Sequence, residues 1–175
     1  SSTEYSIIAT DPDGIILRFN SGSEKLFGWS SKEVVGRVPI AYTFREEDRF
    51  RGVIKEFFRA VEAKGSTEYE RERVRKDGTL FQALAVLTPL KDSSGKTMGF
   101  LEIARDITEK NLLQKELWKT MEYLENIIQS SVDAIVTTNP KGKITLVNRA
   151  MEELVGLPRE KLIGQPIFQF YAGGI

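Results

Sequence analysis

The sequence predicts an α+β fold, and three observations predict it. Short strand patterns open the chain, three longer strand patterns end near residue 105, and capped helical patterns lie between the two groups. A charged helical pattern over residues 107–129 follows the last strand. After this helix, the opening order of strand, turn, strand and helix occurs a second time. Strands and helices grouped in this way are typical of an α+β fold.

The first elements are predicted to be a hairpin and a short helix. Residues 6–10 and 15–17 have strand character. The turn from Asp11 to Gly14 joins them, with a proline that fixes φ and a glycine that permits a positive φ. Asn20 can cap the following helix, because its side chain accepts a hydrogen bond from a free backbone N–H group. Gly28 is expected to end that helix.

Two more helices are predicted before the next strand. Ser30 and Glu33 have capping-box spacing, at the start of a short helix that ends at Gly36. Residues 46–63 form a longer helix, whose first residues are acidic, as the helix dipole favours. Six apolar residues recur at helical spacing in this longer helix and are expected to face the core: Phe50, Val53, Ile54, Phe57, Phe58 and Val61.

Three strands complete the first group of elements. Residues 67–76 are nearly all charged, which suits the edge of a sheet, where charge discourages pairing with other chains. The turn Asp77-Gly78 leads to residues 80–90, which are apolar on both faces, as in a central strand that is covered on both sides. Residues 98–105 form the last strand.

An internal repeat relates the two ends of the chain. Positions 128 apart, as Gly14 and Gly142 are, match in turn, cap and core residues. The matching residues of the first unit are Ile7, Thr10, Pro12, Gly14, Ile16, Asn20, Glu24, Leu26, Gly28 and Gly36, and those of the second are Ile135, Thr138, Pro140, Gly142, Ile144, Asn148, Glu152, Leu154, Gly156 and Gly164. The second unit has no counterpart of the long helix and the three strands. We therefore expect it to lean on the first unit, to pair with another chain, or to be a truncated view of a longer protein.

Composition limits the chemistry that the chain can perform. The 25 basic and 25 acidic residues balance, so no bulk field favours nucleic acid or an anionic membrane. No apolar run approaches the roughly 20 residues of a membrane span, and no signal peptide pattern opens the chain. Cysteine and histidine are absent, which excludes disulfides, thiolate nucleophiles, imidazole bases and Cys/His zinc sites. We expect a cytoplasmic chain that contacts neither nucleic acid nor membrane.

The chain resembles the PAS family of sensor domains. The resemblance is carried by the turn Thr10–Gly14, by Asn20, and by the segments Leu26–Ser30, Val35–Arg37, Arg75–Thr79 and Ala104–Thr108. It implies a five-stranded antiparallel sheet with short helices on one face, followed by a helical arm that leads to the next module. We therefore divide the chain into a PAS domain (1–106), a signalling linker helix (107–129) and the N-terminal part of a second, truncated PAS domain (130–175).

The resemblance also implies which sensing chemistries are excluded. Flavin-binding light sensors of the family use a cysteine just after a Gly-Arg like Gly36-Arg37, where Val38-Pro39 stands here, so a cysteinyl-flavin adduct is excluded. Haem ligation by His or Cys is excluded too, since the chain has neither residue. A non-covalently bound small molecule stays compatible with the sequence, and the cofactor is unknown.

Alternation along the three strands defines a candidate ligand pocket. On the face turned toward the helices we place Tyr69, Arg71, Arg73, Ala83, Ala85, Leu87, Glu102 and Ala104. The two alanines leave room, which either a ligand or a large side chain such as Phe57 or Phe58 fills; a self-filled core is the preferred alternative. Glu102 must be paired if it points inward, and we expect its partner to be Arg73 or Arg71.

Two further sets of residues are predicted to carry a signal. Asp106, Ile107 and Thr108 join the last strand to the helical arm, and their hydrogen bonds would let a shift of the strand tilt or rotate the helix; simple N-capping is the alternative. The residues Leu117, Met121, Leu124 and Ile128 have the 4-3-4 spacing of a coiled-coil seam and predict a parallel homodimer.

These features predict a sensor and dimerisation module of a signal-transduction protein, with a sensor histidine kinase as the favoured parent and an output domain downstream. The alternatives are a ligand-free protein–protein interaction scaffold and the sensory region of a transcription regulator or a cyclase. No nucleophile–base pair, phosphate loop or metal cluster supports an enzyme.

Overall fold

The structure is a computed structural model that describes residues 5–170. The chain divides into two compact units, Ser1–Leu112 and Leu113–Ile175. In chain order, the elements of the first unit are β1 (Ser6–Thr10), β2 (Ile16–Phe19), α1 (Ser21–Phe27), α2 (Ser31–Val34), a 3₁₀ turn (Ile40–Thr43), α3 (Glu46–Phe50), α4 (Val53–Lys64), β3 (Thr67–Val74), β4 (Leu80–Lys91) and β5 (Thr97–Asp106). The helix α5 (Thr108–Ser130) follows, and then β6 (Val136–Thr138), β7 (Ile144–Val147), α6 (Arg149–Val155), α7 (Arg159–Leu162) and a 3₁₀ turn (Ile167–Phe170).

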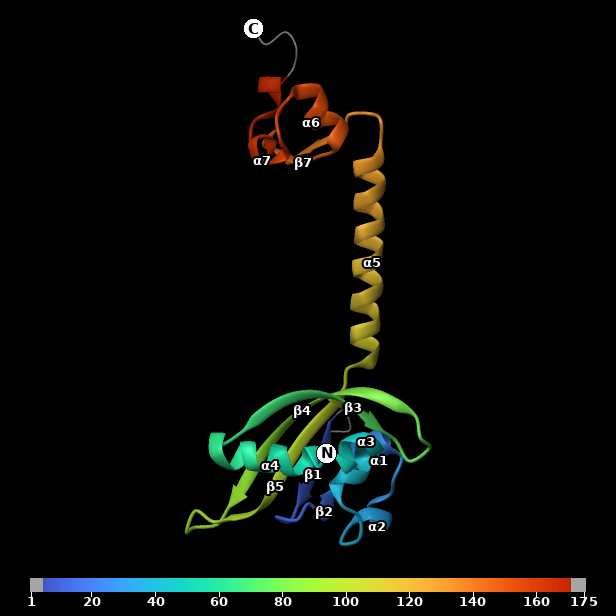
Figure 1. The fold of residues 1–175 in the computed structure, drawn as a ribbon, viewed down its shortest axis with the longest axis vertical. Coiled ribbons are helices and arrows are strands. Elements are labelled where there is room, and N and C mark those ends of the chain that lie inside the picture. The colour runs from blue at the N-terminus through green and yellow to red at the C-terminus, as the bar shows by residue number, and fades with distance from the viewer. Residues whose placement is uncertain (1–4, 171–175) are drawn as a thin grey trace. The chain divides into compact units, whose positions relative to one another are not determined.

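The first unit is built on one five-stranded sheet with the strand order β2-β1-β5-β4-β3. Every neighbouring pair is antiparallel, and β5, the last strand in sequence, lies in the middle. The helices α1 to α4 lie over one face of this sheet (Figure 1), and the apolar core lies between the two layers. The predicted five-stranded antiparallel α+β fold is therefore confirmed, as is the edge position of the charged strand β3.

The opening hairpin and helix form as their sequence predicts. The side-chain oxygen of Asn20 accepts hydrogen bonds from the backbone N–H groups of Ser23 at 2.8 Å and of Ile7 at 2.9 Å, so it ties α1 to β1 while it caps the helix. Gly28 ends α1 with φ +75°. The capping box of Ser30 and Glu33 starts α2, but α2 ends at Val34, before Gly36.

The long helix predicted over residues 46–63 is wrong, since two helices occupy this stretch. Gly52 has φ +71° between α3 and α4, a conformation that glycine adopts at no steric cost. Because of this break, the apolar residues of α3 and α4 do not share one helical face. Phe50, which was expected in the core, is 84% exposed, whereas Val53, Ile54, Phe58 and Val61 of α4 are buried. Helical spacing was correct within α4 and failed where it was continued across a glycine.

The strand β4 is apolar on both faces, but the expectation that both are covered is wrong for the described residues. Its inward residues, among them Phe81 and Leu87, are buried beneath the helices. On the opposite face Val86 and Leu90 remain 37% and 39% exposed. The sheet therefore has one packed face and one apolar face without a partner in the described part of the chain.

The second unit repeats the opening of the first at the level of single hydrogen bonds. Asn148 accepts from the N–H groups of Ile135 at 2.7 Å and of Met151 at 3.0 Å, as Asn20 does from its own two partners. Glu152 accepts from the N–H of Arg159 at 2.6 Å, and Glu24 accepts from Ser31 at the same distance. A small core forms around these bonds, from Ile144, Val147, Met151 and Leu162. Among residues 5–170, no helix of either unit combines the length and the apolar character that a membrane crossing requires.

Candidate functional site

A buried polar cluster lies on the inner face of β3, β4 and β5. Strand register places Tyr69, Ala85 and Ala104 side by side across the three strands. Glu102 lies one step along β5 on the same face, opposite Leu87 of β4. All of the predicted pocket residues except Arg71 are buried: Tyr69, Arg73, Ala83, Ala85, Leu87, Glu102 and Ala104. The alternation read from the sequence therefore brings seven of the eight candidates together.

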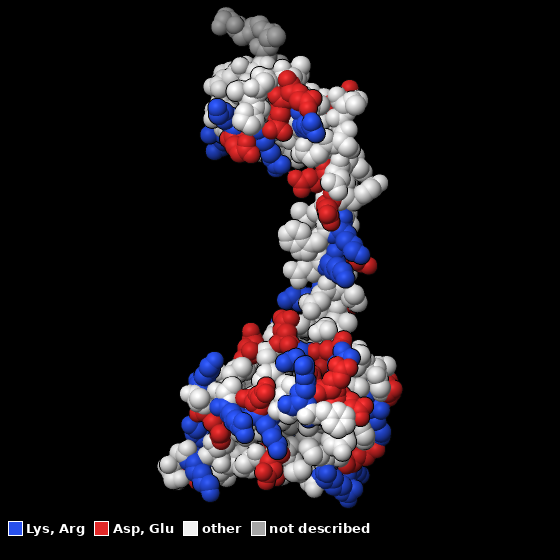
Figure 2. Space-filling model, in the orientation of Figure 1, with Lys and Arg blue, Asp and Glu red and all other residues white. Residues whose placement is uncertain are grey.

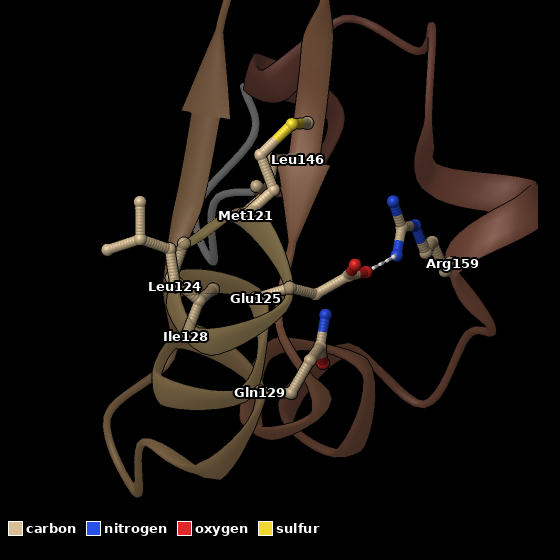
Figure 3. A pocket seen from close by; sticks show the side chains of 7 residues that line it. All are labelled: Met121, Leu124, Glu125, Ile128, Gln129, Leu146 and Arg159. Carbon is tan, nitrogen blue, oxygen red and sulfur yellow. Dashed lines mark hydrogen bonds and ion pairs between the residues drawn. The ribbon is translucent and has the colours of Figure 1, made fainter. Parts of the chain in front are cut away.

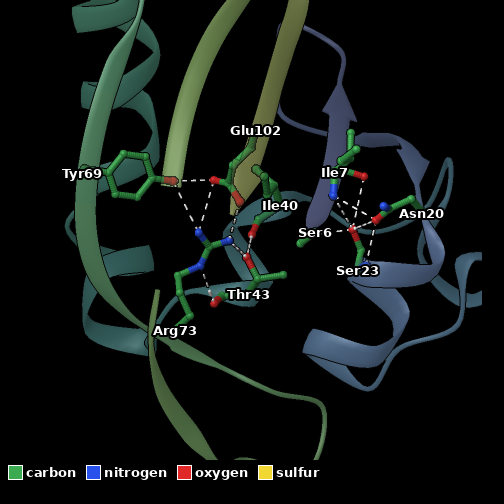
Figure 4. A network of polar contacts seen from close by, with 9 residues as sticks. All are labelled: Ser6, Ile7, Asn20, Ser23, Ile40, Thr43, Tyr69, Arg73 and Glu102. Atoms are coloured by element: carbon green, nitrogen blue, oxygen red, sulfur yellow. Dashed lines mark hydrogen bonds and ion pairs between the residues drawn. The ribbon is translucent and has the colours of Figure 1, made fainter. Parts of the chain in front are cut away.

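Arg73 and Glu102 form an ion pair inside this cluster (Figure 4). Arg73 Nη2 lies 3.1 Å from Glu102 Oε1, and Nη1 lies 3.2 Å from Oε2. Arg73 Nε donates to the carbonyl oxygen of Thr43 at 3.0 Å, and Nη2 also donates to the Thr43 hydroxyl. The hydroxyl of Tyr69 donates to Glu102 Oε2. The charged groups are thus hydrogen-bonded on several sides, which a fully buried ion pair needs if it is not to cost stability.

Burial and neighbouring charges shift the pKa values of Tyr69 and Arg73. Burial raises the pKa of the Tyr69 hydroxyl well above its ordinary value of 10.0, and the negative charge of Glu102 raises it further. For Arg73, burial alone would lower the pKa, but the charge of Glu102 and the contact with Tyr69 outweigh it and raise the pKa above its ordinary value. The guanidinium also lies 3.8 Å from the ring centroid of Phe44, within the range of a cation–π contact.

The two alanines of β4 explain how this cluster can exist. Arg73 and Glu102 come from β3 and β5, which are not neighbours, so their side chains must meet above β4. Ala83 and Ala85 lie beneath that meeting point on the inner face, and a larger side chain at either position would occupy it. The room that the sequence predicted is therefore filled here by the chain's own Arg73, Glu102 and Tyr69.

Arg71 does not pair with Glu102, so that alternative of the prediction is wrong. Its side chain is 43% exposed, and its Nη1 lies 3.9 Å from Asp48 Oδ1 on α3. The guanidinium carbon is 5.8 Å from the ring centroid of Phe57. Arg71 is on the helix side of the sheet, as alternation requires, but it lies on an edge strand. Its long side chain therefore extends past the sheet edge to solvent, where its charge stays hydrated.

The junction Asp106–Thr108 is fastened to the neighbouring strand. The backbone N–H of Ile107 donates to the carbonyl of Gln82 at 2.8 Å, and the N–H of Gln82 donates to Thr108 Oγ1 at 2.8 Å. Asp106 Oδ1 accepts from the N–H of Thr108 at 2.8 Å and so caps α5. Ile107 is buried, and its carbonyl accepts the first helical bond of α5, from Asn111 at 2.9 Å. No unattached loop separates β5 from α5.

Arg75 completes the junction and was not singled out as a site residue from the sequence. Its Nη2 lies 2.6 Å from Asp106 Oδ2, and its other terminal nitrogen donates to the carbonyl of Leu26 at the end of α1. Partial burial acts to raise the pKa of Asp106, but the hydrogen bonds from Thr108 and Arg75 outweigh it, so the pKa lies below the ordinary 3.8. Arg73 of β3 thus pairs with Glu102, and Arg75, which directly follows β3, pairs with Asp106.

The predicted seam residues are exposed along α5. None of the residues Thr108–Ser130, all of which are described, is buried, and charged and uncharged side chains lie together along the visible side of this helix (Figure 2). Leu117, Met121 and Leu124 are more than half exposed. Within the second unit, Met121, Leu124 and Ile128 line a groove of about 320 Å³ together with Leu146 of β7 (Figure 3). Arg159 Nη1 lies 3.5 Å from Glu125 Oε1 at the side of this groove.

Comparison with known proteins identifies relatives for both units. The family described as PAS domain matches residues 4–109, and the family described as PAS fold matches residues 122–174. Two-component system protein A of Emericella nidulans is 31% identical over 107 residues, which are 61% of this chain and 15% of that protein. Sporulation kinase E of Bacillus subtilis is 30% identical over 71 residues, 41% of this chain and 10% of that protein. The chain thus spans only a small part of the length of these relatives.

Solved structures agree with the fold. The PAS domain of a protein from Colwellia psychrerythraea has a TM-score of 0.56 and 30% identity, over 60% of this chain and 87% of that one. The PAS domain of a LuxR-family transcriptional regulator from Burkholderia thailandensis, solved in complex with ethanol, has a TM-score of 0.50 at 18% identity, over 59% and 88% of the two chains. Because the second structure is only 18% identical, its similarity supports the fold and nothing more.

Proposed function

The chain belongs to the PAS domain family, and from that premise we propose that it is the sensor and dimerisation region of a signal-transduction protein whose output domain lies downstream. The relatives in two-component and sporulation-kinase proteins support a signalling role. They also favour a sensor histidine kinase as the parent protein. A PAS domain is a sensory and non-catalytic module. The chain therefore transmits a signal to the output domain through a change of structure and not through a reaction that it catalyses.

The junction Asp106–Thr108 is the observation that carries this proposal. Gln82 bonds to both Ile107 and Thr108, and Arg75 bonds to Asp106, so the start of α5 is fixed to β4 and to the turn after β3 as well as to β5. A displacement of the sheet therefore moves the first turn of α5 with it. A helix held only by a flexible connection would not follow the sheet.

A chimaera tests the proposal. The chain replaces the sensor region of a histidine kinase, in helical phase with that kinase's own linker, and autophosphorylation is measured. We expect Thr108→Val, which removes the bond to Gln82, to change autophosphorylation at least threefold in either direction. Glu109→Gln, one residue along on the exposed face of α5, is the matched control and should leave it unchanged. Equal activity in all three chimaeras would contradict transmission through this junction.

The self-filled cluster favours a second candidate, a ligand-free scaffold. Tyr69, Arg73 and Glu102 occupy the room above the two alanines, and Phe57 stacks on Tyr69 with ring centroids 4.4 Å apart. A native mass spectrum and an absorbance scan of the purified chain separate the two candidates. A bound small mass or a visible chromophore supports a ligand sensor, and the bare chain mass supports the scaffold.

A further inference from the structure

The turn after β3 connects the helix α1 to the start of α5. Arg75 directly follows β3, and its terminal nitrogens bond to the carbonyl of Leu26 in α1 and, at 2.6 Å, to Asp106 Oδ2. The backbone N–H of Lys76, the next residue, donates to the carbonyl of Phe27 at 2.8 Å. The last turn of α1 is therefore bonded to the same residue that bonds to the junction Asp106–Thr108.

Lys76 extends this connection to α2. Its ammonium group forms an ion pair with Glu33 of α2 and lies 5.0 Å from the ring centroid of Trp29. Glu33 also accepts from the backbone N–H of Ser30 at 2.8 Å, so one carboxylate both caps α2 and binds Lys76. The hydrogen bond from Lys76, together with those from Ser30, lowers the pKa of Glu33 to about 2. The pair therefore stays charged at neutral pH.

The internal repeat indicates that a helix at this position forms without the contact. Three residues of the first unit differ from their counterparts 128 positions later, namely Trp29, Ser30 and Glu33 from Leu157, Pro158 and Lys161. The charge at the position of Glu33 is thus reversed, yet α7 spans the residues of the second unit that are equivalent to α2. An exposed ion pair also contributes little to stability. The contact between Lys76 and Glu33 therefore needs an explanation other than helix formation.

We infer that Lys76 and Glu33 are positioning residues that couple α2 to the junction Asp106–Thr108. A displacement of α2 moves Lys76 through its ion pair with Glu33, and it moves the adjacent Arg75 and the carboxylate of Asp106 with it. The start of α5 then responds to α1 and α2 as well as to the sheet. The effect of this coupling on signalling rests on the proposed function. Since a contact can shift an equilibrium only by its own free energy, we expect effects of a few fold.

Amide hydrogen exchange of the full chain, followed by NMR, tests the coupling. The reporters are the amides of Ile107 and Gln82, which donate across the junction, and the amide of Ile16 in β2 is the internal reference. Lys76→Met removes the charge but keeps an unbranched apolar stem. We expect the two junction amides to exchange about threefold faster than in the wild type, because the junction opens locally more often, and the Ile16 amide to exchange at the wild-type rate.

A double-mutant cycle shows whether the two residues act as a pair. Glu33→Gln keeps an oxygen that can cap α2 but removes the charge, and it should speed exchange at the junction as Lys76→Met does. The double variant should exchange no faster than either single variant. Lys76→Arg keeps the charge and should preserve the wild-type rates. Lys32→Met, exposed on α2 beside Glu33, is the matched control and should preserve them too.

The outcomes separate this inference from the proposed function. Unchanged exchange at the junction in Lys76→Met, an equal increase at Ile16, or additive effects in the double variant overturns the inference. In the kinase chimaera, Lys76→Met should change autophosphorylation about twofold. If exchange at the junction rises but neither Lys76→Met nor Thr108→Val changes autophosphorylation, the coupling is upheld and the proposed function is wrong. If Thr108→Val alone changes autophosphorylation and exchange is unchanged in Lys76→Met, the proposed function is upheld and the inference is wrong.

Discussion

At the scale of single residues, two arginines of the first unit form ion pairs across the intervening strand β4. Arg73 of β3 and Arg75, which directly follows the end of β3, both form ion pairs with carboxylates of β5 on the far side of β4. The first pair is buried and the second is partly exposed at the start of α5. The buried pair costs desolvation energy, which its hydrogen bonds offset, so its contribution is mainly to fix one packing of the three strands.

Removing one partner of the buried pair should destabilise the fold strongly. Glu102→Ala leaves the Arg73 guanidinium buried without its counter-charge, and we expect a loss of about 3–5 kcal/mol in the free energy of unfolding. The double change Arg73→Met with Glu102→Leu replaces both charges by apolar groups and should recover most of that loss. Urea denaturation followed by circular dichroism measures both.

Arg71→Met is the matched control, because Arg71 lies two residues before Arg73 on β3 but its side chain is 43% exposed. It should change stability by less than about 1 kcal/mol. A similar loss for Arg71→Met and Glu102→Ala would show that the buried pair has no special role.

The pKa of Asp106 predicts an acid-dependent loss of stability at the junction. Its pKa is lowered in the folded chain from the ordinary 3.8 by hydrogen bonds from Thr108 and Arg75 that outweigh partial burial. A group with a lowered folded pKa contributes stability above its unfolded pKa and loses it as pH falls through the folded value. Between pH 5 and pH 2, the wild-type chain should therefore lose more stability than Asp106→Asn. Parallel curves of melting temperature against pH would contradict this.

The sequence predicted much of the cluster and missed the residues that alternation does not reach. Strand parity placed Tyr69, Arg73 and Glu102 on one face, because period-2 alternation persists along regular strands. Thr43 accepts hydrogen bonds from Arg73 through its carbonyl and hydroxyl oxygens. It lies in a 3₁₀ turn about 30 residues earlier in the sequence, where no periodicity relates it to β3. Its position depends on tertiary packing.

At the scale of elements, two glycines allow close backbone contacts that the periodicity of the sequence does not predict. A Cβ atom on Gly22 of α1 would lie 2.0 Å from the carbonyl oxygen of Tyr5, and one on Gly99 of β5 would lie 1.9 Å from that of Thr10. Both glycines therefore let two elements touch through their backbones. Local sequence reveals neither contact, just as it did not reveal that Gly52 divides the helix predicted over residues 46–63.

Gly22→Ala should destabilise the first unit, although helix propensity alone predicts the opposite sign. Alanine inside a helix is favoured over glycine by up to about 1 kcal/mol. Here the added methyl group would force α1 away from β1, and we expect a net loss of about 2 kcal/mol or more. Lys25→Ala, exposed in the same helix, should have little effect. Thermal unfolding of the two variants beside the wild type checks the sign, and an unchanged or raised melting temperature for Gly22→Ala would contradict the close approach.

At the scale of the whole molecule, one local design occurs twice along the chain. The asparagine cap, the glutamate bond to the next helix and the left-handed glycine recur at an offset of 128 residues. Such residues fix turns and helix ends locally, which is why the repeat could be detected from sequence. After Gly164 the offset falls to 127, because the N–H of Ile144 bonds to Gln165 where that of Ile16 bonds to Val38.

The apolar stripe of α5, formed by Leu117, Met121, Leu124 and Ile128, predicts that the chain dimerises through this helix. Leu117, Met121 and Leu124 remain more than half exposed, and helix stability in proteins comes mostly from packing of an apolar face. We expect the stripe to pair in parallel with its counterpart in a second copy. Leu117→Glu with Leu124→Glu should then weaken dimerisation at least tenfold in sedimentation equilibrium and lower the helical circular dichroism signal. Lys115→Glu with Lys119→Glu, on the charged side of α5, is the matched control and should preserve both. If the seam variant and the wild type associate equally, dimerisation does not depend on the stripe, and the prediction is wrong.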